Sequence, residues 1–72
     1  MSYGEKAVGL TFNPSGDGDV HRIKTLYAAI IDEMVALIQV TTSDEAVRLA
    51  KIAITEAQGA QMWAVKAVTW KD

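Results

Sequence analysis

Three side chains in the second half of the chain have the types and the spacing to hold phosphate. Arg48, Lys51 and Thr55 are three and four residues apart, so a helix places them on one face. A guanidinium, an ammonium and a hydroxyl in a row can donate hydrogen bonds to phosphate oxygens. The alternative is that these three side chains form an ordinary solvent-exposed face of the helix and bind no ligand. That alternative weakens in a symmetric oligomer, where copies of the row would repel one another without an anion between them.

A second group of candidate binding residues lies near the N-terminus. Arg22 and Lys24 fall in the first turns of an expected helix, close in sequence to the aromatic Phe12. The glycine-rich run from Ser15 to Gly18 precedes this helix, as anion-binding turns do. It lacks the lysine and hydroxyl end of a nucleotide-triphosphate loop, and its aspartate would repel phosphate. By itself it is a weak phosphate site.

The sequence contains no motif for catalysis or metal binding. His21 is the only histidine and there is no cysteine, so a nucleophile with an adjacent base is not indicated. Asp17 and Asp19 supply two positions of a calcium loop without the remaining ligands, and we interpret them as loop and helix cap. We therefore expect a protein that is not an enzyme and that uses no metal and no cofactor.

Two regions are expected to position these side chains. Residues 1–18 are rich in glycine and include the turn signature from Asn13 to Gly16, which predicts an irregular N-terminal arm anchored by Leu10 and Phe12. Residues 19–72 are expected to form a helical hairpin domain. Its first helix should begin near Asp19, an N-cap residue, and it carries two apolar rows.

The break between the two helices falls at residues 41–43. Thr42 followed by Glu45 has the pattern of a capping box, which predicts a second helix from about residue 43 to 70. Because the connection is short, the helices should be antiparallel neighbours. Periodicity supports no strand, so the fold class is all-α. Gly59 inside the second helix suggests close approach by another backbone or a ligand.

A row of alanines predicts an assembly larger than one chain. They follow a heptad spacing on the second helix: Ala46, Ala50, Ala53, Ala57, Ala60, Ala64 and Ala67. Such a stripe lets another helix approach closely. The chain has 72 residues, of which 50% are hydrophobic, which is more apolar surface than one short hairpin can bury. We therefore expect a helical homo-oligomer.

Charge and hydropathy narrow the classes of partner. The net charge of −2 argues against long nucleic acid as the main ligand. No apolar run reaches about 18 residues, so we expect no transmembrane helix and no membrane partner. The N-terminus lacks a basic region followed by an apolar core, so it does not have the pattern of a signal peptide. Residence in the cytosol of the host cell is the resulting expectation.

Several stretches together resemble the phage-encoded anti-CBASS and anti-Thoeris hairpin family, small proteins that sequester the cyclic nucleotide signals of bacterial immunity. The stretches are Phe12 to Gly16, Val20 to Ile31, Ala53 to Thr55 and Gln61 to Ala67. The similarity spans roughly residues 9 to 70, and the last stretch is its most specific part. The resemblance implies a helical hairpin that assembles into a hexamer, with ligand pockets between subunits and release of the messenger intact.

The resemblance also implies two types of pocket. One uses an aromatic residue of the arm and a lysine of the first helix, which match Phe12 and Lys24, with Asn13 beside them as a further candidate. Phenylalanine in place of the tyrosine of relatives still stacks on a base but has no hydroxyl. The other pocket type uses a basic residue and a threonine of the second helix, which match Lys51 and Thr55, with Arg48 nearby.

Two functions are consistent with these observations. The first is a sponge for cyclic oligonucleotides, namely cyclic dinucleotides and, at the second pocket type, cyclic trinucleotides. The second is a small structural or regulatory helical oligomer that contacts another protein, which the alanine row and the absence of a strong site motif would also fit. Binding of a cyclic nucleotide separates the two, because only the sponge should be stabilised by it.

Overall fold

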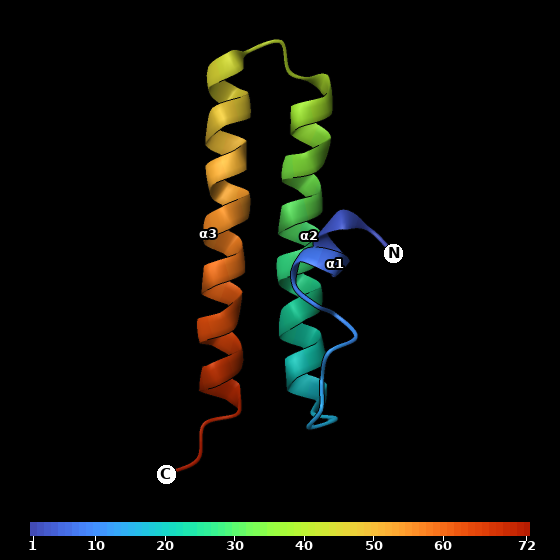
Figure 1. Cartoon of the computed structure of the whole chain (residues 1–72), viewed down its shortest axis with the longest axis vertical. Coiled ribbons are helices and arrows are strands. Elements are labelled where there is room, and N and C mark those ends of the chain that lie inside the picture. Colours follow the sequence, from blue (N-terminus) through green and yellow to red (C-terminus); the bar gives the residue numbers. More distant parts are fainter.

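Two long antiparallel helices and one short helix make up the protein. The computed structural model describes all residues from 1 to 72, with α1 at Tyr3–Ala7, α2 at Gly18–Val40 and α3 at Asp44–Val68. Helices α2 and α3 run side by side and are joined by a short turn, and α1 lies against α2 (Figure 1). The all-α helical hairpin predicted from the sequence is therefore confirmed.

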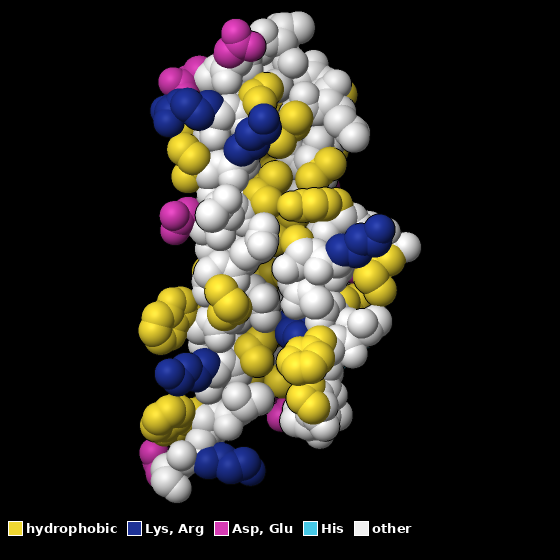
Figure 2. All heavy atoms as spheres, viewed as in Figure 1, with side chains coloured by type: hydrophobic (Ala, Val, Ile, Leu, Met, Phe, Trp, Pro, Cys, Tyr) yellow, Lys and Arg dark blue, Asp and Glu magenta, His cyan; other side chains and the backbone are white.

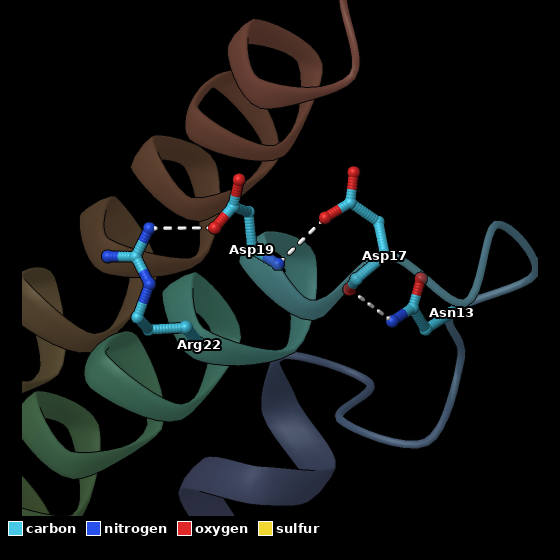
Figure 3. A network of polar contacts seen from close by, with 4 residues as sticks. All are labelled: Asn13, Asp17, Asp19 and Arg22. Atoms are coloured by element: carbon cyan, nitrogen blue, oxygen red, sulfur yellow. Dashed lines mark hydrogen bonds and ion pairs between the residues drawn. The ribbon is translucent and has the colours of Figure 1, made fainter.

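The N-terminus of α2 is capped two residues earlier than the sequence suggested. The carboxylate of Asp17 accepts a hydrogen bond from the backbone N–H of Asp19 at 2.7 Å, which makes Asp17 the N-cap residue. The Asp19 side chain pairs instead with Arg22 at 3.1 Å (Figure 3). Both aspartates still lie at the positive end of the helix, where a carboxylate is favourable.

The N-terminus of α3 uses a serine rather than the predicted pair of Thr42 and Glu45. The Ser43 hydroxyl accepts a hydrogen bond from the backbone N–H of Ala46 at 3.1 Å. The Glu45 side chain is instead paired with Arg48, so the predicted capping box is not formed. The expected start of this helix is correct to within one residue, and its end at Val68 comes two residues early.

The N-terminal arm is not irregular throughout, which corrects the sequence-based expectation. Helix α1 begins with a capping box, because the Ser2 hydroxyl accepts from the Glu5 N–H at 3.1 Å and the Glu5 carboxylate accepts from the Ser2 N–H at 2.8 Å. A serine followed three residues later by a glutamate is a readable signal for a helix start.

Helix α1 is held against α2 by a close backbone contact. The Gly4 N–H donates a hydrogen bond to the Asp32 carboxylate at 2.7 Å, and a Cβ at residue 4 would collide with the backbone carbonyl of Ala28. Only glycine therefore allows this approach. The apolar anchors of the arm are the buried Val8 and the predicted Leu10, which packs against the core. Phe12, the other predicted anchor, is 72% exposed.

The core of the hairpin is small, and part of the alanine row belongs to it. Its buried members are Val8, Ala28, Ile31 and Ile54, from all three helical regions. In α3, Ala50 is buried and Ala57 packs against the core, whereas Ala60 is exposed. The alanine row is thus divided between the hairpin interior and its outer surface. A Cβ at Gly59 would meet no other part of the chain within 4 Å, so the close approach expected there is not made by this hairpin.

Much apolar surface remains uncovered on both long helices (Figure 2). The large exposed side chains of the two long helices include Leu26, Ile30, Leu37, Leu49, Ile52, Met62 and Trp63. Each of the two helices is too polar overall to cross a membrane. So many exposed large apolar side chains around so small a core favour a surface that contacts another protein molecule.

Candidate functional site

One groove lies where the arm meets the ends of α2 and α3. This first groove has a volume of about 710 Å³, within the range of small-molecule sites. The residues that line it are Lys6, Ala7, Val8, Gly9, Phe12, Asn13, Pro14, Ser15, Val20, Lys24, Gln61, Met62, Val65 and Thr69. Segments far apart in the sequence therefore form one surface, with the arm on one side and α3 on the other.

The structure brings Phe12 and Lys24, the predicted pair, together in this groove. Lys24 is only 5% exposed although it is charged. Its ammonium donates hydrogen bonds to the backbone carbonyls of Gly9 at 3.0 Å and Phe12 at 2.5 Å. It also lies 5.5 Å from the centre of the Phe12 ring, within the range of a cation–π contact. Lys24 thus fastens the arm to α2 and sets the position of the aromatic ring.

The charge and shape of the first groove suit a flat anion. Lys6 and Lys24 both line it, and no aspartate or glutamate does. The largely exposed Phe12 ring leaves a flat apolar surface free for stacking. Two cations without a carboxylate to neutralise them attract phosphate, and the ring accepts a base.

Asn13, the third predicted residue at this groove, is engaged within the arm. Its amide nitrogen donates to the Asp17 carbonyl at 2.9 Å (Figure 3), and its amide oxygen accepts from the Ser15 hydroxyl at 2.9 Å. Both polar ends of the side chain therefore stabilise the turn that carries Phe12. Arg22 pairs with Asp19 on the surface and does not line the groove.

A second, smaller groove contains two of the three residues predicted on the second long helix. It has a volume of about 420 Å³ and is lined by Tyr3, Val35, Ile38, Lys51, Ile54, Thr55 and Gln58. The Lys51 ammonium has no ion-pair or hydrogen-bond partner within the chain, so it is free to meet an anion. The Thr55 hydroxyl donates to the backbone carbonyl of Lys51 at a long distance of 3.3 Å, so a phosphate would have to compete for its proton.

Arg48, the third member of the predicted row, lies outside the second groove. Its guanidinium is paired with Glu45 at 2.5 Å, and both side chains are largely exposed. Exposed ion pairs of this kind contribute little to stability. Within one chain, Glu45 therefore neutralises the charge of Arg48, whereas the charge of Lys51 has no partner.

Sequence reasoning missed several residues that line the two grooves. Gln61, Met62 and Val65 form the α3 wall of the first groove, and the signal for them was the stretch Gln61 to Ala67 on which the family resemblance mainly rested. Tyr3 reaches the second groove because α1 is docked onto α2. Its position could not be predicted without recognising that short helix.

Histidine and carboxylate side chains do not gather in one place in the structure. His21 is exposed on the first turns of α2. No group of three or more histidine, aspartate or glutamate side chains comes together as metal ligands.

Comparison with known proteins gives one match. The family model described as "Acb2/Tad1, hairpin domain" matches residues 5–69. The matched range includes α2, α3, most of the arm and every residue that lines the first groove. No curated protein and no solved structure matches the chain.

Proposed function

Because the chain belongs to the Acb2/Tad1 hairpin family, whose members are non-enzymatic sponges for the cyclic nucleotides of CBASS and Thoeris immunity, we propose that it captures cyclic dinucleotides in the first groove. The observation that supports this most is the pairing of the Lys24 ammonium with the exposed Phe12 ring. A cyclic dinucleotide presents flat bases and phosphates, which need this combination of a platform and a cation.

The second groove is proposed as a site for cyclic trinucleotides. Lys51 supplies an unpaired cation and Thr55 a hydroxyl one helical turn away. Around a three-fold axis, copies of this pair would match a ring of phosphates better than a single phosphate. Arg48 would add to the site only if the ligand displaced Glu45 from it.

A ligand-induced rise in thermal stability tests the proposed function. At about 100 times its Kd, a cyclic dinucleotide that binds only the folded protein adds about 2.7 kcal/mol of stability. We expect a clear rise in Tm with a cyclic dinucleotide and none with its linear counterpart or with duplex DNA. Chromatography of the ligand after denaturing the complex should recover it intact. A structural or regulatory oligomer would give no shift with any of these ligands.

The uncovered apolar surface supports a homo-oligomer, and we propose the hexamer that the family resemblance implies. Ala57 packs inside the hairpin whereas Ala60 faces outward, so the two positions separate folding from assembly. Ala60→Leu is expected to overpack the contact between the alanine row and a neighbouring subunit, which should destabilise the assembly by about 1–3 kcal/mol at each copy. The sedimentation coefficient should fall as a result. Ala57→Leu should instead lower the stability of the hairpin. A parent protein that sediments as a folded monomer at micromolar concentration would contradict the proposal.

A further inference from the structure

Helix α1 contributes one residue, Tyr3, to the second groove. Tyr3 is the only aromatic residue that lines this groove, and Lys51 and Thr55 line it as well. Tyr3 is 54% exposed, and its hydroxyl makes no hydrogen bond within the chain. The second groove therefore has the same two components as the first, a cation and an aromatic residue. Its aromatic residue comes from outside the two long helices.

A single side-chain hydrogen bond attaches the start of α1 to α2, against which the short helix lies (Figure 1). The Gly4 N–H donates to the Asp32 carboxylate at 2.7 Å, and Gly4 is buried, so this N–H would lose its only partner without the carboxylate. The capping box of Ser2 and Glu5 makes the first turn of α1, including Tyr3, one unit. A helix of five residues is not stable alone, so the position of this turn depends on its attachment to α2.

The other end of α1 is attached independently of Asp32. Val8, which follows α1, is buried in the core, and the Lys24 ammonium donates to the Gly9 carbonyl at 3.0 Å. These two contacts hold the segment of the arm that lines the first groove. Asp32 itself lines neither groove. Loss of the Asp32 contact should therefore displace the start of α1 and leave the first groove in place.

We propose that Asp32 is a positioning residue for the second groove: it holds Tyr3 at the groove wall, where the ring is a stacking surface for a base of the bound nucleotide. This inference rests on the proposed function of the second groove. The Asp32 carboxylate makes no ion pair, so its effect is carried by the hydrogen bond to Gly4. An asparagine oxygen can accept the same hydrogen bond without the negative charge.

Titrations of folded variants with cyclic tri-AMP and cyclic di-AMP test this role. Tyr3→Ala should weaken cyclic tri-AMP binding by about 5- to 150-fold, the range for one base–aromatic stack, whereas Tyr3→Phe should keep most of the affinity. Asp32→Ala should weaken it by about fivefold or more, because α1 then spends part of its time away from the groove. Asp32→Asn should restore binding close to that of the parent. Cyclic di-AMP affinity should stay within about threefold of the parent throughout.

Two further variants control for charge and for the route of the effect. Glu33→Ala removes a carboxylate from the next position on α2, where Glu33 is exposed and makes no side-chain hydrogen bond or ion pair. It should bind both ligands as the parent does. Gly4→Ala leaves the Asp32 carboxylate in place, but its Cβ would collide with the backbone carbonyl of Ala28. It should reproduce the selective loss of cyclic tri-AMP binding.

A double-mutant cycle shows whether Asp32 acts through Tyr3. Because the ring is already absent in Tyr3→Ala, adding Asp32→Ala should change the affinity for cyclic tri-AMP by less than about twofold. A measurement without ligand tests the attachment itself. Hydrogen exchange of the amides of residues 4–7 should be faster in Asp32→Ala than in Glu33→Ala, since the first turn of α1 opens more often.

The outcomes separate this inference from the proposed function. Parent protein that does not bind cyclic tri-AMP contradicts the proposed function of the second groove, whatever the exchange rates are. Where the parent binds, the inference is overturned if Asp32→Ala loses both ligands equally or loses neither, if Asp32→Asn binds as weakly as Asp32→Ala, or if the losses in the cycle are additive. Equal exchange rates in Asp32→Ala and Glu33→Ala overturn it without reference to any ligand.

Discussion

Replacing Lys24 with methionine is expected to weaken binding of a cyclic dinucleotide by at least about 100-fold, since charge-assisted hydrogen bonds contribute about 1.5–3 kcal/mol each. The buried ammonium holds the carbonyls of Gly9 and Phe12, so its removal frees the segment that carries the stacking ring. Methionine keeps most of the buried stem, which limits the loss of packing. Isothermal titration calorimetry of parent and variant measures the effect.

Lys6→Met is the matched control for this prediction. Lys6 also lines the first groove, but it is exposed and makes no hydrogen bond through its side chain. Its loss removes one positive charge without releasing the arm, so affinity should fall by no more than about tenfold. A Lys24→Met variant that binds within about threefold of the parent would show that the arm holds Phe12 in place without the ammonium.

The hairpin could be predicted from the sequence because its signals are local. Apolar positions at helical spacing, with hydroxyl or carboxylate residues at the breaks, predicted the ends of both long helices to within two residues. The α1 helix was missed because a helix of five residues has too little periodicity to detect, and only the Ser2 and Glu5 pair marks it. Its docking depends on a contact of Gly4 with α2 that no local pattern encodes.

The candidate site was predicted in part. Residues close together in the sequence could be predicted as neighbours, whereas residues brought together by the fold could not. Phe12 and Lys24 were expected to be neighbours, and the structure brings them together through carbonyl hydrogen bonds. The stretch from Gln61 to Ala67 was distinctive in the sequence, but the burial of Gln61 at the first groove depends on how the arm folds over the hairpin. The pairing of Arg48 with Glu45 follows from their spacing of three residues on a helix, which brings opposite charges together.

The second large effect is expected from Lys51→Glu, which should abolish binding of a cyclic trinucleotide while leaving dinucleotide binding close to that of the parent. The Lys51 ammonium is unpaired and lines the second groove, whereas Phe12 and Lys24 line the first. The two grooves have no lining residue in common. Charge reversal removes a phosphate contact and adds a repulsive carboxylate, and symmetry would multiply both effects. We expect a loss of at least about 100-fold, because charge-assisted bonds contribute about 1.5–3 kcal/mol each.

Arg48→Glu makes the same change of charge one turn earlier on α3 and serves as the control. Arg48 lies outside the groove and is already neutralised by Glu45, so trinucleotide affinity should change much less than for Lys51→Glu.

Phe12→Ala should show the reverse selectivity, with loss of dinucleotide binding and retention of trinucleotide binding, since it removes a stacking surface from the first groove alone. Competition titrations with both ligand classes on all three variants distinguish the grooves. Equal losses of both classes in Lys51→Glu and in Phe12→Ala would mean one shared site. A parent that binds no trinucleotide would leave the Lys51 face as a solvated surface.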